Sequence, residues 1–231
     1  MKYENFFYEK YQKNVFSQNG EDGVIEEILK RLNLDDRWCC EFGAWDGKYL
    51  SNTFKLIREG YSAVLIEGDK KKHIDLLKTS EQYPSIIPIN RFVDLSENSL
   101  DNILSETIIP KDFSLLSIDI DTNDYQVWDS LKNYRPIVVV IEINSEVYPF
   151  DYEWVHNEDK NIVQTSWGAM YEMAKDKGYK FVCHTGNMIF VRQDHFEKLD
   201  IEIPENPIYN FRRFWIQRNS KEYNKFLLLN N

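Results

Sequence analysis

The stretch Trp38–Asp69 reads WCCEFGAWDGKYLSNTFKLIREGYSAVLIEGD and has the pattern of a strand, a loop, a helix and a second strand. The apolar run 37–42 indicates a buried strand that enters a tight turn at Gly43. Helical spacing over 50–60 follows, and a second apolar run over 63–66 indicates the next strand. The apolar face of that helix is expected to consist of Leu50, Phe54 and Ile57. This stretch therefore predicts one strand–helix–strand unit of a parallel α/β sheet.

The turn after the first strand has the features of a nucleoside site. Gly43 and Gly47 bracket it, and residues without side chains let a ligand lie against the backbone. Glu67 follows the second strand, where an acid accepts hydrogen bonds from the hydroxyls of a ribose. EFGAWDG is not the G-x-G-x-x-G that places a pyrophosphate at a helix N-terminus. Glu41 and Asp46 would repel a diphosphate but suit a cationic or zwitterionic ligand, while the alternative is a purely structural turn.

Composition limits the class of protein. The chain has 231 residues, 42% of them hydrophobic and 15% aromatic, which suffices for one domain with a substantial core. Adjacent Cys39 and Cys40 point to opposite faces of a strand, and a third cysteine makes the count odd, so we expect no disulfide framework and a cytoplasmic setting. The net charge of −10 argues against a nucleic-acid surface. No apolar run has the length of a membrane span, and we expect none.

The remaining pattern extends the sheet. Further strands are expected at 86–93, 115–120 and 137–146, followed by a hairpin that joins 179–184 to 188–192 around Gly186-Asn187. Helices are expected between them, among others at 97–107 and 167–177. We expect a mostly parallel seven-stranded α/β sheet with a terminal antiparallel hairpin and helices on both faces. The whole chain, 1–231, is interpreted as one domain with three appendages, which are an N-terminal arm (1–16), an acceptor-binding loop (144–166) and a C-terminal extension (204–231).

Acidic residues follow the predicted parallel strands. Ligands of open α/β sheets bind at the carboxyl ends of the strands, and five acids fall there: Glu41, Glu67, Asp119, Asp121 and Glu142. Strand alternation places Asp119 and Asp121 on one face. Two such carboxylates repel each other unless a cation or a proton neutralises them. The sequence therefore predicts the functional site at this edge of the sheet.

The connection 144–166 is longer than an ordinary loop and rich in polar and aromatic residues. Its side chains Tyr148, Tyr152, Trp154 and His156 either line an acceptor pocket or hold the loop against the domain. We therefore expect 144–166 to bind the acceptor, with structural packing as the alternative.

Five motifs carry a resemblance to a known family: SQNGED, EFGAWDG, LIEGD, SIDID with an acid three residues on, and PIVVVIEIN. They resemble class I S-adenosylmethionine-dependent methyltransferases, and among these the FkbM-like group, over Ser17 to Val191. The resemblance implies a Rossmann-like methyltransferase fold with S-adenosylmethionine as cofactor. It also implies O-methylation of a small-molecule hydroxyl, on a sugar, an activated sugar or a polysaccharide precursor. Residues 119–124 read DIDTND where the group typically shows DVEGAE, so the geometry of this loop departs from the family pattern.

The resemblance also implies site residues. An apolar Val93 would stack on the adenine ring, and Asp94 would accept from its amino group, unless Asp94 instead caps the next helix. Gln18 belongs to a segment that lies beside the cofactor pocket in the family. The full set of implied cofactor contacts is Gln18, Glu41, Gly43, Ala44, Asp46, Asn52, Glu67, Gly68, Val93, Asp94 and Asp119.

Two chemical routes are open for a hydroxyl acceptor. Either Asp119, Asp124 or His184 removes the proton as general base, or an ion such as Mg²⁺ acidifies the hydroxyl. The candidate ligands of that ion are Asp119, Asp121, Glu142 and Asn144. The alternatives from other classes are an NAD-type Rossmann oxidoreductase or epimerase and a catalytically inactive cofactor-binding module. Association with a second copy of the chain stays open.

Overall fold

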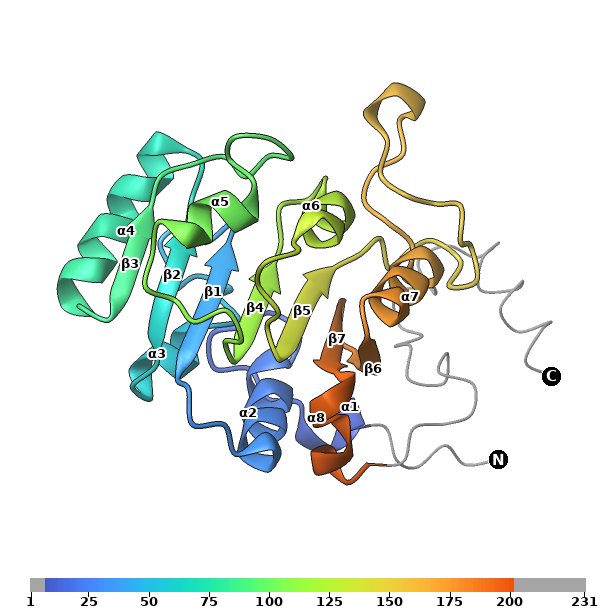
Figure 1. Ribbon diagram of the computed structural model, residues 1–231, viewed down its shortest axis with the longest axis horizontal. Coiled ribbons are helices and arrows are strands. Elements are labelled where there is room, and N and C mark those ends of the chain that lie inside the picture. Colours follow the sequence, from blue (N-terminus) through green and yellow to red (C-terminus); the bar gives the residue numbers. More distant parts are fainter. Residues whose placement is uncertain (1–6, 202–231) are drawn as a thin grey trace.

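The computed structural model describes residues 7–201, and these form a three-layer α/β structure around one seven-stranded sheet (Figure 1). The strand order is β3-β2-β1-β4-β5-β7-β6. Strands β1 to β5 are parallel, and β7 runs antiparallel between β5 and β6. This arrangement confirms the predicted mostly parallel sheet with a terminal hairpin and helices on both faces.

The strands and helices have the following bounds. The strands are β1 (Trp38–Phe42), β2 (Ser62–Ile66), β3 (Ile86–Ile89), β4 (Leu115–Ile118), β5 (Val138–Glu142), β6 (Tyr179–His184) and β7 (Asn187–Arg192). The α-helices are α1 (Phe7–Tyr11), α2 (Glu21–Leu32), α3 (Phe54–Arg58), α4 (Lys70–Gln82), α5 (Leu100–Ser105), α6 (Asp124–Ser130), α7 (Trp167–Asp176) and α8 (Gln193–Phe196). Two short 3₁₀ helices are η1 (Glu158–Lys160) and η2 (Glu197–Leu199).

The sheet separates two hydrophobic cores. Helices α5, α6 and α7 cover one face, where Trp128, Trp167 and Phe190 are almost fully buried. Helices α1 to α4 cover the other face with Ile28, Phe54 and other apolar residues. All of β4 is buried, as expected for a central strand covered by helices on both sides. The central strands are therefore held firmly, and their ends give a fixed platform for a site.

The segment after β1 differs from the prediction. Leu50 was expected on a helical face, but α3 begins only at Phe54, and Leu50 is 41% exposed with a φ of 55°. The cause is a polar turn: the Ser51 hydroxyl donates to Glu41 (2.6 Å) and accepts from the Thr53 and Phe54 backbone N–H groups. Such side-chain bonds compete with helix formation. The prediction of a helix through Leu50 was wrong.

The segment after β3 also differs. The strand expected to reach residue 93 ends at Ile89, and the helix expected over 97–107 is the shorter α5. Asp94 closes a turn by accepting from the Ser96 and Asn98 backbone N–H groups. Ser99, and not Asp94, caps α5. The predicted capping role of Asp94 toward this helix was therefore wrong.

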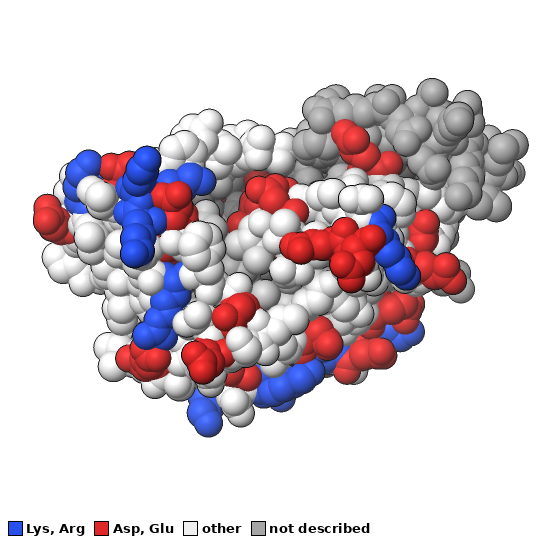
Figure 2. Space-filling model, turned by 90° about the horizontal axis from the view of Figure 1, so that it is seen from above, with Lys and Arg blue, Asp and Glu red and all other residues white. Residues whose placement is uncertain are grey.

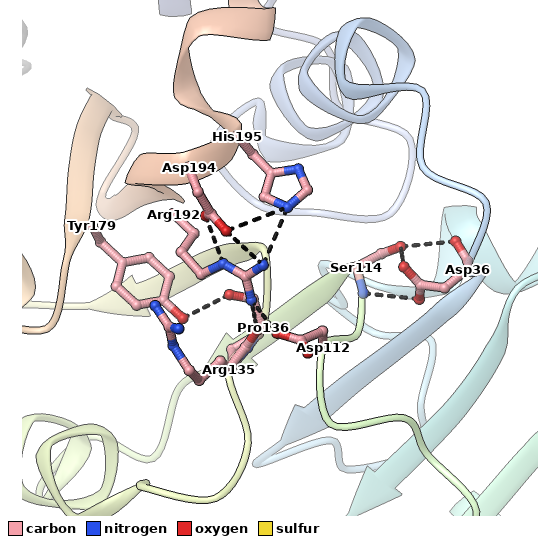
Figure 3. Close-up of polar contacts among 9 residues, drawn as sticks. All are labelled: Asp36, Asp112, Ser114, Arg135, Pro136, Tyr179, Arg192, Asp194 and His195. Atoms are coloured by element: carbon pink, nitrogen blue, oxygen red, sulfur yellow. Dashed lines mark hydrogen bonds and ion pairs between the residues drawn. The ribbon is translucent and has the colours of Figure 1, made fainter.

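The opposite, amino edge of the sheet is tied by a separate polar cluster (Figure 3). The Arg192 guanidinium donates to Asp112, to Asp194 and to the Arg135 carbonyl oxygen (2.7 Å for the last). Beside it, Asp36 accepts from the Ser114 backbone N–H and hydroxyl. These contacts join the ends of the chain segments that enter β1, β4 and β5, on the side away from the acidic strand ends.

Two predicted appendages are described only in part. Residues 7–11 of the predicted N-terminal arm form α1, while 1–6 and the predicted extension 204–231 lie outside the described residues. The connection 144–166 extends above the rest of the molecule in Figure 1, and Asn157 pairs with Ile162 within it. Over residues 7–201, no helix combines the length and apolar character that crossing a membrane requires.

Candidate active site

Two pockets lie at the carboxyl ends of the parallel strands, and Asp119 lines both. The first, here called the β2 pocket, has a volume of about 430 Å³ and is lined by residues including Gly43, Glu67, Gly68, Phe92, Val93 and Asp119. The second, here called the β5 pocket, has a volume of about 370 Å³ and is lined by residues including Gln18, Glu21, Asn52, Asp119, Glu142 and Asn144. Both pockets lie at the edge of the sheet where the sequence predicts the functional site.

Gly43 allows the ends of β1 and β4 to meet. Its φ is 76°, in the left-handed region, and a Cβ added there would lie 1.9 Å from the Asp119 carbonyl oxygen. A side chain at this position would therefore push Asp119 away. Ala44 continues the turn and donates its N–H to the Ile66 carbonyl oxygen (3.2 Å). The turn thus connects β1, β2 and β4 at the entrance of the β2 pocket.

Glu67 is buried at the end of β2 and held from both sides. Its Oε2 accepts from the Trp45 N–H (2.8 Å), and its Oε1 accepts from the Asp69 N–H (2.8 Å). A carboxylate has about four acceptor positions, so each oxygen can accept one more hydrogen bond. Glu67 is therefore a fixed acceptor whose two oxygens are both available to a diol in the β2 pocket.

The outer wall of the β2 pocket is an exposed aromatic ring. Phe92 is 73% exposed, and a Cβ added to Gly68 would lie only 2.3 Å from a carbon of its ring. Val93 lines the same pocket, whereas Asp94 faces its own turn and is not among the lining residues. The wall presents apolar surface at which a flat ring could stack.

Three predicted contacts have internal partners instead. Glu41 is buried and accepts from Ser51, Thr53 and the Asn52 N–H, and burial raises the pKa of its carboxyl. Asp46 accepts from the Lys48 and Tyr49 N–H groups within its own turn. Among the residues that the structure places, neither acid lines one of the two pockets, and neither does Ala44.

Glu41 nevertheless shapes the site through its neighbour. By holding the Asn52 N–H at 2.9 Å it fixes the residue whose side chain lines the β5 pocket. The Asn52 side-chain amide donates to the Ser117 hydroxyl (3.0 Å) on β4. Glu41 thus fixes the loop after β1, and Asn52 in that loop lines the β5 pocket.

Three carboxylates meet where the pockets join. One oxygen from each of Asp119, Asp121 and Glu142 lies within 4.8 Å of the others. Burial raises the pKa of Asp119 and of Glu142, and the negative charge of Asp119 raises that of Glu142 further. Carboxylates this close repel each other, so the arrangement favours a proton or a cation between them.

The other predicted metal ligand and two predicted bases lie outside this trio. Asn144 lines the β5 pocket, but its side-chain oxygen accepts from the Glu146 N–H (3.1 Å). His184 is fully buried, and its Nε2 lies 2.8 Å from the hydroxyl of Ser145, which does line the β5 pocket. Asp124 accepts from the Ile120 N–H (2.9 Å) and lines neither pocket.

Asp124 leads to a prediction on stability. Its Oδ2 is buried with no hydrogen-bond partner in the described part of the chain, and burial raises its pKa to about 7. Since the folded protein then holds a proton that the unfolded chain releases near pH 4, stability falls as pH rises from about 4 to 7. We expect Asp124→Asn to stabilise the protein by about 1–3 kcal/mol at pH 8 and by less at pH 5.

The measurement is urea unfolding of both proteins at the two pH values with EDTA present. Asp129→Asn is the matched control, because Asp129 lies on the same helix and is exposed. Equal stabilisation at pH 5 and pH 8 would contradict a buried, protonated Asp124.

Several lining residues had no signal in the sequence. Asn19, Glu21, Gln164 and Asn187 line the β5 pocket from three separate segments, and Lys72 and Arg91 line the β2 pocket. No short motif unites them, because the fold alone brings them together.

The two pockets differ in charge. Acids and amides dominate the lining of the β5 pocket, and no Lys or Arg of the described chain belongs to it. Figure 2 shows the same edge from above, with basic side chains gathered on the side where α4 lies and acidic ones over the centre. Neutral or cationic groups therefore suit the β5 pocket better than anions.

Comparison with known proteins places the fold. No protein-family model matches the chain, and no curated protein matches it significantly. Solved structures do match. A methyltransferase dependent on S-adenosylmethionine from Aquifex aeolicus has a TM-score of 0.43 and 12% identity, over 74% of this chain and 88% of that one. The N-terminal domain of EvdMO1 with S-adenosylhomocysteine bound has a TM-score of 0.45 and 9% identity, over 76% and 80%.

A protein from Staphylococcus aureus, assigned as a caffeoyl-CoA O-methyltransferase, gives a TM-score of 0.52 with 13% identity. The alignment covers 78% of this chain and 85% of that protein. Likeness at this level concerns the arrangement of the strands and helices and leaves the activity open. The chain has the Rossmann-like fold of class I methyltransferases.

Proposed function

We propose that the protein is an S-adenosylmethionine-dependent O-methyltransferase of the FkbM-like type that acts on a hydroxyl of a small polar molecule, namely a saccharide, an activated sugar or a polysaccharide precursor. One observation carries the proposal: Asp119 lines both pockets, so ligands in the two pockets would meet at its carboxylate. A transferase needs such a junction, because the donor and the acceptor must lie in line and in contact.

The β2 pocket fits the nucleoside part of the cofactor. Glu67 offers both oxygens to the ribose hydroxyls, and Phe92 offers an exposed ring to the adenine. Gly43 and Gly68 stand where a Cβ would close the space or displace its wall. When bound, the cofactor supplies a methyl group on a positively charged sulfur. The carboxylate of Asp119 is suited to orient that positive end toward the β5 pocket.

The β5 pocket supports a polyhydroxylated acceptor. Amide and carboxylate side chains, such as those of Gln18, Asn52 and Glu142, pair with hydroxyl groups as donors and acceptors. Because its described lining holds no cation, the phosphates of an activated sugar would have to lie outside this pocket. The neighbouring connection 144–166 supplies Asn144 and Gln164 to the wall, which supports its proposed role in acceptor binding.

Proton removal from the acceptor hydroxyl falls to the acidic trio. Asp119 lines both pockets and is proposed as general base, with Glu142 holding a proton beside it. The same three oxygens could hold Mg²⁺, whose chemistry would be to lower the pKa of the acceptor hydroxyl. In that case Asp119, Asp121 and Glu142 are the ligands, and Asn144 positions the acceptor.

Calorimetric titration tests the proposal. We expect S-adenosylhomocysteine to bind with a Kd on the order of micromolar, as needed for a cellular cofactor, and NADH not to bind. Tighter binding in Mg²⁺, or activity only with Mg²⁺, would select the metal route over the general base. Binding of NADH with no binding of S-adenosylhomocysteine would instead favour a Rossmann oxidoreductase or epimerase.

A further inference from the structure

The loop that precedes α2 is held by one buried carboxylate. The Oδ2 atom of Asp22 accepts from three consecutive backbone N–H groups, those of Val15, Phe16 and Ser17, at 2.7–2.8 Å. It also accepts from the Ser17 hydroxyl at 2.7 Å. Three N–H groups that converge on one point form a site for an anion, and here the anion belongs to the chain itself. Asp22 is 2% exposed, so these bonds are shielded from water.

The bond between Asp22 and Ser17 is reciprocal. The Ser17 hydroxyl oxygen accepts from the Asp22 backbone N–H (3.0 Å), an N–H that α2 leaves without an intrahelical partner in its first turn. Asn14 adds a second tie, because its side chain donates to the Gln18 carbonyl oxygen (3.0 Å) and accepts from the Gly20 N–H. Residues 14–20 are thus a closed loop with a defined backbone.

Glu21 connects this loop to the far end of the sheet. One of its oxygens accepts from the Asn19 N–H (2.7 Å), and the other accepts from the Thr185 hydroxyl (2.5 Å) in the turn between β6 and β7. Glu21 is 1% exposed. Gly186 and Asn187, which follow Thr185, line the β5 pocket together with Gln18 and Asn19. The two sides of this wall are therefore fixed relative to each other.

We infer that Asp22 is a positioning residue for ligand binding: through residues 15–17 it holds Gln18 and Asn19 as a rigid wall of the β5 pocket. The inference rests on the proposed function and adds one element to it: the non-nucleoside end of the cofactor extends past Asp119 into the β5 pocket, beside the acceptor. Asp22 itself touches neither pocket. A wall fixed before the ligand arrives lowers the entropy cost of binding, so loosening it weakens binding without removing any contact group.

The structure offers a matched control at the other edge of the sheet. Asp36 likewise accepts from backbone N–H groups, those of Trp38 (3.1 Å) and Ser114 (3.0 Å), and from a serine hydroxyl (2.9 Å). It lies at the amino edge (Figure 3), away from both pockets. Asp36→Ala therefore removes a comparable set of bonds where no ligand is expected.

The experiment compares the wild-type protein with Asp22→Ala, Asp22→Asn and Asp36→Ala by calorimetry, using S-adenosylhomocysteine and adenosine as probes. Adenosine requires only the β2 pocket. We expect Asp22→Ala to raise the Kd of S-adenosylhomocysteine about tenfold or more and to change the Kd of adenosine less than about threefold. Asp22→Asn should recover much of the affinity, because its amide oxygen can replace Oδ2 while its NH₂ takes the place of Oδ1, which has no partner within residues 7–201.

A second readout does not depend on a ligand. Lys13 is exposed, and its backbone is bonded to Gly20 and Gly23 across the same loop. Cleavage of a folded protein requires local opening, so trypsin should cut after Lys13 faster in Asp22→Ala than in wild type or Asp36→Ala.

Equal Kd values of Asp22→Ala and Asp36→Ala for S-adenosylhomocysteine, with wild-type binding intact, would overturn the inference alone, as would unchanged trypsin cleavage. A wild-type protein that binds neither probe would overturn the proposed function and the inference with it.

Discussion

Glu67→Ala should raise the Kd for S-adenosylhomocysteine at least about 100-fold, which corresponds to the loss of two charge-assisted hydrogen bonds. The Glu67 carboxylate is buried at the end of β2 and fixed by the Trp45 and Asp69 N–H groups. The substitution removes the acceptors for the ribose hydroxyls and also releases the turn at Trp45. Both effects weaken the β2 pocket, so we expect this change to have the largest effect on binding.

Asp69→Ala is the matched control for this experiment. The Asp69 side chain accepts from the Lys71 and Lys72 N–H groups and so caps α4, and its loss should lower the stability of the fold slightly. Its backbone N–H to Glu67 is unaffected by the change. Calorimetry should therefore find near wild-type affinity in Asp69→Ala. Unchanged affinity in Glu67→Ala would remove Glu67 from the ribose site.

Asp119→Ala should reduce kcat about 10²–10⁴-fold, the range that general acid–base catalysis supplies. The Kd for S-adenosylhomocysteine should change less than about tenfold, since the ribose and adenine contacts lie elsewhere in the β2 pocket. Asp119 lies at the junction of the two pockets, where a general base acts during methyl transfer and not during cofactor binding. The substitution should therefore affect kcat much more than the Kd. Single-turnover rates together with calorimetry separate the two effects.

Two further variants distinguish the general-base route from the metal route of proton removal. Asp129→Ala is the control, because Asp129 is an exposed acid of α6 that pairs with Lys132 at 3.6 Å. Asp121→Ala should have a small effect if Asp119 acts as a base, and an effect as large as that of Asp119→Ala if the trio holds Mg²⁺. Full activity in Asp119→Ala would exclude Asp119 from both routes.

The sheet could be predicted because its strands are local apolar runs with polar ends. Buried β5 reads as a continuous hydrophobic segment and β4 as an apolar run interrupted only by Ser117, and the turn between β6 and β7 lies at Gly186, as its glycine predicts. The late start of α3 at Phe54 could not be predicted, because the bond between Ser51 and Glu41 joins residues ten positions apart and leaves no local pattern. The same holds for Asp94, whose turn depends on which backbone groups are close after folding.

The sequence predicts the edge of the sheet at which the site lies, but it does not predict the role of each acid there. Strand ends place Glu67, Asp119 and Glu142 at one edge, because parallel strands share the same direction. Whether an acid is available to a ligand depends on the hydrogen bonds that its carboxylate makes within the folded chain. Glu41 is engaged by its own loop, whereas Asp119 remains open to both pockets. Hydrogen bonds between residues far apart in the sequence, such as that between Glu21 and Thr185, leave no local sequence pattern.

The position of β7 between β5 and β6 has a consequence for synthesis of the chain. All residues that line the β2 pocket lie between 42 and 123, so that half of the site can assemble as soon as those residues have emerged. The β5 pocket must wait for Gly186 and Asn187, and its bond between Glu21 and Thr185 spans 164 positions. Such non-local contacts form late and slow the folding of a chain. During translation the nucleoside side of the cleft is therefore expected to mature well before the acceptor side.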